Sequence, residues 1–243
     1  MTSIERTAYP RFKRYYTKCE LKQIYTPTFE EKNFGLTHTS GETNYFNFIV
    51  LLKLFQRLGY FPELNDVPSQ ITEHLRKELS LEQKVKIGYE TPRTLYRHRR
   101  LIRSYLEVIP YSQEASFLVR QTVIQSAYIR DNPADLINIA IEELIKNRYE
   151  LPSYRELDRT INHLRTQVNQ QLFETTIQQL TPEMIEALNG LLKNHPSEKT
   201  TPFNQLKQLP LRPSRNHRLG FISSFKMVDV FRRNSFLFTT YYQ

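Results

Sequence analysis

Residues 44–58, NYFNFIVLLKLFQRL, contain the longest apolar run of the chain and restrict its fold more than any other segment. Apolar positions recur there at intervals of three and four, as on one face of an α-helix, and Ile49 to Leu52 are apolar on nearly every side. The chain also has only six glycines, and no segment shows the sustained alternation of a β-strand. We therefore expect an all-α protein with 44–58 as a central buried helix; a groove for a hydrophobic partner is the alternative.

Helix start signals recur along the rest of the chain. Ser80 and Ser153 each precede a Gln or Glu by three residues, which is the spacing of a capping box, and Thr91, Asn132 and Thr181 each stand directly before a proline suited to the first turn. Together with the apolar spacing they predict helices at residues 26–34, 68–79, 80–88, 92–106, 112–129, 133–148, 153–179 and 181–194.

The composition narrows the class of protein. Lysine and arginine number 34 against 25 acidic residues, a formal charge of +9, which favours polyanionic partners such as nucleic acid or an acidic membrane surface. Cys19 is the single cysteine, so no disulfide can form within the chain and a reducing compartment fits best. The longest apolar run contains Lys53 and is too short to span a membrane. We expect a soluble intracellular protein.

The segment at residues 91–106, TPRTLYRHRRLIRSYL, holds five arginines and a histidine and no acidic residue. On a helix, its apolar residues fall on one side and its basic residues on the other, with no glutamate at i,i+4 to relieve the repulsion. Unpaired cations in such a row favour a phosphate-bearing partner, although an ordinary solvated face is the alternative. The candidate contact residues are Arg93, Tyr96, Arg97, Arg99, Arg100 and Arg103.

Two further segments repeat this pattern more weakly. The helix predicted at 153–179 carries Arg155, Arg159 and Arg165 away from its leucine face. The segment PLRPSRNHR contributes Arg212 and Arg215 on a proline-stiffened strap that could lie along a groove, or that could be a plain basic linker. Arginine can bind backbone phosphates or read a guanine edge, and the sequence does not separate these two roles.

No set of residues indicates catalysis. The six histidines are scattered without metal-ligand spacing, and neither a Gly-rich phosphate loop nor a Gly-x-Ser-x-Gly motif occurs. The acidic pairs Glu30-Glu31 and Glu142-Glu143 are adjacent within predicted helices, so their side chains point in different directions. We therefore predict a binding protein with no catalytic residue, no metal and no cofactor.

Several segments together resemble the N-terminal DNA-binding region of the Tn-three family of replicative transposases. The resemblance lies in GETNYFNFIVLLKLFQRLGYFP, in VPSQITEHLRKEL, in the aromatic and basic helix TLYRHRRLIRSYL, and in LPSYRELDRTINHLRTQVNQQLFETTIQQLTPEMIEALNGLL. It ends in LKQLPLRPSRN, where Leu211 replaces a glycine that is usual in the family. Each motif alone is weakly specific, but their order and spacing over residues 10–216 together are fairly specific for the family.

The resemblance implies a function. It implies sequence-specific binding of double-stranded DNA at the terminal inverted repeats of a transposon, by a bacterial protein of the cytoplasm that joins the nucleoid when bound. Strand cleavage and joining in that family belong to a ribonuclease-H-like domain with three metal-binding acids, which we expect to be absent, so no catalytic residue carries over. Association with intact transposase, with sequestration of the transposon ends, is a further expectation, and no membrane partner is expected.

The C-terminal tail, HRLGFISSFKMVDVFRRNSFLFTTYYQ, departs from the family pattern. Back-translating KMVDVFRRN one base forward permits a helical sequence in which Met227-Val228 forces a tryptophan. Our hypothesis is a frameshift near residues 215–217, and it fails if the shifted frame of the coding DNA does not continue into the rest of a transposase.

These observations predict an all-α protein of two small helical subdomains with helix-turn-helix-like character. Residues 1–150 form the first DNA-binding subdomain, 151–210 form the second, and 211–243 form the basic strap and the atypical tail. The alternative function is a helical protein- or RNA-interaction module with basic binding faces.

Overall fold

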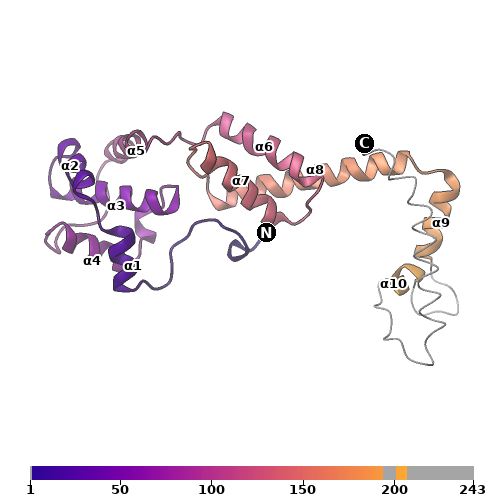
Figure 1. Ribbon diagram of the computed structural model, residues 1–243, viewed down its shortest axis with the longest axis horizontal. Coiled ribbons are helices and arrows are strands. Elements are labelled where there is room, and N and C mark those ends of the chain that lie inside the picture. Colours follow the sequence, from indigo (N-terminus) through magenta and orange to yellow (C-terminus); the bar gives the residue numbers. More distant parts are fainter. Residues whose placement is uncertain (1, 194–200, 207–243) are drawn as a thin grey trace, which may run out of the picture. The chain divides into compact units, whose positions relative to one another are not determined.

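A computed structural model of the chain describes residues 2–193 and 201–206, and within them every regular element is helical (Figure 1). The expected all-α fold is confirmed. Short 3-10 turns occur at Ile4–Arg6 and Leu64–Asp66. The α-helices are α1 (Lys18–Tyr25), α2 (Phe29–His38), α3 (Glu42–Leu58), α4 (Ser69–Glu78), α5 (Pro92–Leu106), α6 (Gln113–Ala127), α7 (Pro133–Lys146), α8 (Tyr154–Gln178), α9 (Pro182–Leu192) and α10 (Pro202–Leu206).

α3 is the centre of the first hydrophobic core. Residues Phe48 to Leu52 are completely buried, because α1, α2, α4 and α5 all contact α3 or its neighbours and cover it on several sides (Figure 1). Because it is buried on every side, this helix is apolar nearly all round, whereas a helix with one solvated face carries polar residues on that face. The predicted central helix is confirmed.

Charged and polar groups inside this core are paired. Lys53 and Glu31 are only 7% and 4% exposed, and the Lys53 Nζ lies 3.2 Å from the Glu31 Oε2. Glu31 also accepts hydrogen bonds from the Thr28 amide at 2.8 Å and from the Gln56 Nε2 at 2.6 Å. The capping box of α2 therefore supplies the carboxylate that neutralises a lysine on α3.

The helix predicted from Ser80 is wrong, because this serine closes α4 instead of starting a new helix. Ser80 has a left-handed φ of 56°, and its amide donates to the Lys77 carbonyl, while the Leu81 amide donates to the Arg76 carbonyl. This is the Schellman pattern of a helix end. The loop that follows is held by the buried Asn47 side chain, which donates to the Gly88 carbonyl and accepts from the Gly88 amide.

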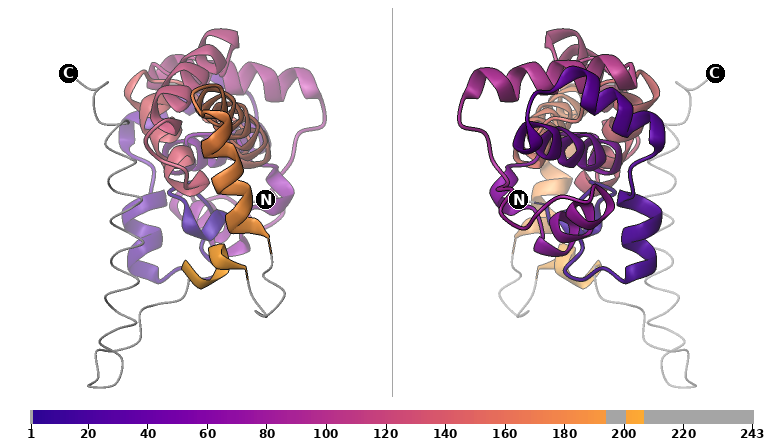
Figure 2. Two further views of the ribbon diagram at one scale, coloured as in Figure 1. Left: turned by 90° about the vertical axis from the view of Figure 1, so that its right-hand side faces the viewer. Right: turned by 90° about the vertical axis from the view of Figure 1, so that its left-hand side faces the viewer.

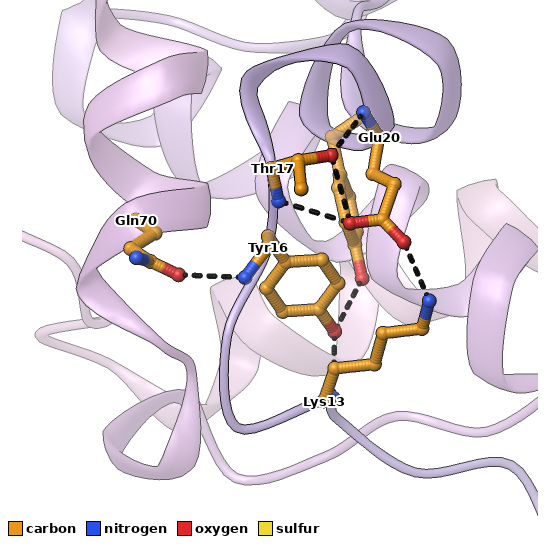
Figure 3. A network of polar contacts seen from close by, with 6 residues as sticks. Lys13, Tyr16, Thr17, Glu20 and Gln70 are labelled. Carbon is orange, nitrogen blue, oxygen red and sulfur yellow. Dashed lines mark hydrogen bonds and ion pairs between the residues drawn. The ribbon is translucent and has the colours of Figure 1, made fainter.

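α1 is a helix that the sequence signals above did not include. It begins after Thr17, whose side chain accepts from the Glu20 amide while Glu20 accepts from the Thr17 amide, so a complete capping box is present (Figure 3). The Thr17-x-x-Glu20 spacing is visible in the sequence. Basic residues surround it on both sides and give the segment the appearance of a charged arm.

A second hydrophobic core lies between α6, α7 and the first part of α8 (Figure 1). Small and branched residues face inward from each helix at intervals of three and four. They are Ala115, Val119 and Val123 on α6, Leu136, Ala140 and Leu144 on α7, and Leu157, Ile161, Leu164 and Val168 on α8. The N-terminal segment closes this core with Tyr9, whose hydroxyl donates to the Pro152 carbonyl at 2.7 Å.

The two cores are joined by a short backbone junction. The Ile109 amide donates to the Arg148 carbonyl and the Glu150 amide donates to the Ile109 carbonyl, both at 2.8 Å, and the Leu151 amide donates to the Gly59 carbonyl at 2.9 Å. The end of α5 is thereby tied to the end of α7 and to the residue that follows α3.

Contacts divide the chain into two compact units, Met1–Phe173 and Glu174–Gln243. Residues of α8 up to Val168 share a core with α6 and α7, so this part of α8 lies with the first unit. In the second unit α9 follows a Thr181 cap and Pro182, as the sequence predicts, and α10 contacts α9. The predicted boundary between DNA-binding subdomains at residue 150 stays a prediction, and the strap and tail at 211–243 lie outside the described residues.

Candidate nucleic-acid interface

α5 has a strongly two-sided surface. It begins at Pro92 after Thr91, has no acidic residue in its first turn, and ends before Glu107, which has a left-handed φ of 53°. Its inner side packs on α3 through the completely buried Ile102, with Leu95, Leu101, Tyr105 and Leu106 partly buried in the same core. The side predicted to face the core does so.

His98 also lies on this inner side and is completely buried. Its Nδ1 is 2.7 Å from the Tyr89 hydroxyl, and its ring meets the Phe48 ring edge-on at 5.3 Å between centroids. The Nε2 atom has no hydrogen-bond partner among the described residues. Burial, with the nearby Arg97 charge, lowers the pKa of His98 to about 4, so this histidine is neutral at pH 7 and adds nothing to the positive charge of the helix.

The outer side of α5 presents Arg93, Tyr96, Arg97 and Arg100 to solvent, with Tyr96 65% exposed. Because these residues follow one another at intervals of three, one and three, they form a strip about 10 Å long on the helix surface. None of its arginines forms an ion pair with another described residue. We call these four residues the α5 strip.

Arg99 and Arg103 occupy the flank of α5, where they take part in packing. Arg103 donates from Nε to the Glu150 Oε2 at 2.7 Å, and its guanidinium lies 5.0 Å from the centroid of the Phe61 ring. The Arg99 guanidinium lies 5.3 Å from the same ring, and its Nε is buried with no hydrogen-bond partner among the described residues. Both arginines therefore help to fix α5 against the junction.

The arginines of α8 fall into two groups. Arg155 and Arg159 are exposed one turn apart, and neither forms an ion pair with another described residue. Arg165 instead donates from Nε and Nη2 to the two carboxylate oxygens of Asp131 at 2.8 and 3.1 Å. The hydrogen bonds from Arg165 and then from Asn169 lower the pKa of Asp131 to about 2. The charge of Arg165 is thus compensated within the chain.

A second group of exposed cations lies outside the predicted contact residues. Arg14 precedes α1, Lys18 is its first residue and Lys22 lies in its last turn. The sequence shows them as a basic N-terminal stretch, but the helix that presents two of them was not predicted. Arg212 and Arg215, in contrast, were predicted contacts and lie outside the described residues.

Two kinds of feature are absent from the described residues. These residues contain no group of three or more His, Cys, Asp or Glu side chains placed to hold a metal ion. In the same part of the chain, no helix is both long enough and apolar enough to cross a bilayer.

Comparison with known proteins adds three similarities. Residues 1–164 match a family described as a domain of unknown function, DUF4158. The chain is 25% identical over 206 residues to the transposase for transposon Tn1546 of Enterococcus faecium, covering 83% of this chain and 21% of the relative. It is 26% identical over 210 residues to the transposase for transposon Tn501 of Pseudomonas aeruginosa, covering 84% and 21%. The chain thus spans about a fifth of the length of these relatives.

Proposed function

Because the chain belongs to the DUF4158 family and corresponds to the N-terminal region of Tn-three-family transposases, we propose that it binds duplex DNA at the terminal inverted repeats of a transposon. The family resemblance seen in the sequence motifs is confirmed by these comparisons. We propose, beyond this family membership, that the chain binds terminal repeats and that individual arginines make the contacts.

The observation that supports the proposal most directly is the α5 strip. Arg93, Arg97 and Arg100 are exposed on one side of a helix whose other side is fixed in the core, and no carboxylate of the described residues neutralises them. A helix of this kind fits the major groove, where arginines can bind phosphates or the guanine edge. The Tyr96 hydroxyl, in the same strip, can donate a hydrogen bond to a DNA phosphate.

The other predicted contact residues differ in whether they already bind a partner within the chain. Arg155 and Arg159 are available, and they form the second contact region of the proposal. Arg103 and Arg165 would have to leave Glu150 and Asp131 to bind a phosphate, and Arg99 would have to leave Phe61. In the proposal these three arginines position helices, and Arg212 and Arg215 extend the contact as predicted from the sequence.

The proposal assigns no chemistry to the region itself. Strand cleavage and joining are assigned to the ribonuclease-H-like domain of a whole transposase, as the family resemblance implies. Binding in the bacterial cytoplasm, at the nucleoid, and association with intact transposase are part of the same proposal.

The test is a double variant of the α5 strip, Arg97→Ala with Arg100→Ala. Its affinity for a duplex carrying the terminal repeat of the encoding element should fall, and the negative slope of log affinity against log salt should become shallower by about 2, because two phosphate contacts are removed. Fluorescence anisotropy over a range of salt concentrations measures both quantities. Arg120→Ala with Arg130→Ala, two exposed arginines on and after α6, is the control with the same loss of charge.

Binding and a salt slope equal to those of the unaltered chain would remove α5 from the interface. A scrambled duplex and a structured RNA are measured alongside the repeat duplex. Equal affinity for all three would refute recognition of terminal repeats and favour an RNA- or protein-interaction module.

A further inference from the structure

A second cationic surface lies along α1 and the residues just before it. Arg14, Tyr15, Lys18 and Lys22 are all exposed, Tyr15 to 69%, and we call them the α1 surface. None of its three cations forms an ion pair with another described residue. Three uncompensated cations beside an exposed tyrosine match the donors that proteins use on nucleic-acid phosphates.

The backbone under this surface is fixed by a polar network (Figure 3). The buried Tyr16 donates from its amide to the Gln70 Oε1 at 3.1 Å, and its hydroxyl accepts from the Lys13 amide at 3.0 Å and lies 3.2 Å from the Tyr25 hydroxyl. Tyr15, the neighbour of Tyr16 in the chain, remains exposed. The basic side chains therefore project from an ordered base, which lowers the entropy lost when they bind a partner.

The carboxylate nearest in sequence is already occupied. Glu20 accepts from the Lys13 Nζ at 2.6 Å and from the Thr17 amide at 2.9 Å (Figure 3). The hydrogen bond from Lys13, followed by those from Thr17, lowers the pKa of Glu20 to about 2, so this group stays ionised in the pair. Glu20 thus balances Lys13 and caps α1, and the charges of Lys18 and Lys22 on the helix remain uncompensated.

The α1 surface and the α5 strip lie on different sides of the first core. α1 contacts α3 and α4, α5 contacts α3, and Figures 1 and 2 show α1 and α5 on opposite sides of α3. One straight duplex therefore cannot lie against both surfaces, and a single duplex would have to bend around the core, at a cost in deformation energy.

We infer that the α1 surface binds the phosphate backbone of a second segment of duplex DNA while the α5 strip binds the terminal repeat. The inference rests on the proposed function and adds to it a second DNA partner. Two of the three cations, Lys18 and Lys22, are lysines, which bind phosphate as point charges, so we assign the contacts at α1 to the backbone, independent of base sequence. One chain then holds two duplex segments, one on each side of its first core.

A bridging experiment tests the inference. Beads carrying the terminal-repeat duplex are incubated with the full chain and then with a fluorescent duplex of unrelated sequence, and the fluorescence retained is measured. The variant Arg14→Gln, Lys18→Gln, Lys22→Gln should bind the beads as the unaltered chain does but lose capture of the second duplex. For the unrelated duplex alone, the negative slope of its log affinity against log salt should become shallower by about 3, one for each phosphate contact removed.

The matched control removes the same charge elsewhere. The variant Arg120→Gln, Arg130→Gln, Lys146→Gln alters exposed cations on and near α6 and α7 and should retain both binding and capture. Cys19, the single cysteine of the chain, is exposed on α1 between Lys18 and Lys22 and reports the site directly. With one equivalent of repeat duplex bound, addition of the unrelated duplex should slow the alkylation of Cys19 by a neutral maleimide.

The outcomes separate the inference from the proposed function. If the unaltered chain does not bind the repeat beads, the proposed function is wrong. If the chain binds them but captures no second duplex, or if the α1 variant captures as much as the unaltered chain, the inference is wrong and the proposed function stands. Capture of polyglutamate in place of duplex would identify an acidic protein as the partner of α1 and would also overturn the inference.

Discussion

Acidification should weaken the attachment of α5 to the core through His98. The folded pKa is about 4 and the ordinary value is 6.5, and a pKa difference of one unit corresponds to about 1.4 kcal/mol, so the linkage is worth at most about 3 kcal/mol. The sign follows from the proton uptake of each state. Between these two values the unfolded chain binds a proton at His98 and the folded chain does not, so stability is complete above pH 6.5 and is lost as the pH falls to about 4.

The assay is urea unfolding, followed by circular dichroism, of the unaltered chain and of His98→Asn at several pH values across this window. Asparagine keeps a polar atom near the Tyr89 hydroxyl but does not titrate. Other groups, among them His74, whose pKa is also lowered by burial, titrate in both proteins and cancel in the difference. The stability of the unaltered chain relative to the variant should therefore fall by about 3 kcal/mol between about pH 7 and pH 4.

A difference that stays constant over this range would refute the reasoning, because it would mean that His98 accepts a proton in the folded protein as easily as in the unfolded chain. Loss of repeat-DNA binding over the same pH range, in the unaltered chain more than in the variant, would connect the linkage to the α5 strip.

Two further predictions concern ion pairs. Lys53→Met should destabilise the chain by about 3 kcal/mol in urea unfolding, because it leaves the buried Glu31 carboxylate without its cation. Adding Glu31→Gln should recover much of this loss. A Lys53→Met variant as stable as the unaltered chain would contradict the pairing. Asp131→Asn should destabilise the chain above about pH 4. The difference from the unaltered chain should disappear as the pH falls through about 2, because the Arg165 partner lowers the pKa of Asp131. Thermal unfolding in this acid range measures it, and a loss independent of pH would speak against the pair.

Periodicity and caps predicted the helices best where one side of a helix meets the core. The Thr91-Pro92 start and the apolar spacing placed α5 and correctly separated its buried and exposed sides. Ser80 shows the limit of this approach. A serine three residues before a glutamine has the spacing of a helix start, but a left-handed backbone at the end of α4 took precedence, and no neighbouring residue signals that conformation.

The ion pairs of the arginines could not be predicted, because their partners are distant in sequence. The absence of a glutamate at i,i+4 indicated correctly that the charges of α5 are not balanced within the helix. Arg103 is paired with Glu150, 47 positions away, and Arg165 with Asp131, 34 positions away. Only the fold brings these groups together, so the sequence did not separate the paired Arg103 and Arg165 from the unpaired arginines of the same helices.

The burial of His98 has a consequence for how such a region can diversify. Inserting or deleting one residue ahead of it in α5 would turn the preceding part of the helix by about 100° relative to the core, which would move an outer arginine inward or an inner apolar residue outward. The buried imidazole therefore fixes which side of α5 faces the core. Under the proposed function, DNA preference would therefore change through substitution of single outer side chains, and not through a shift in the rotation of the helix.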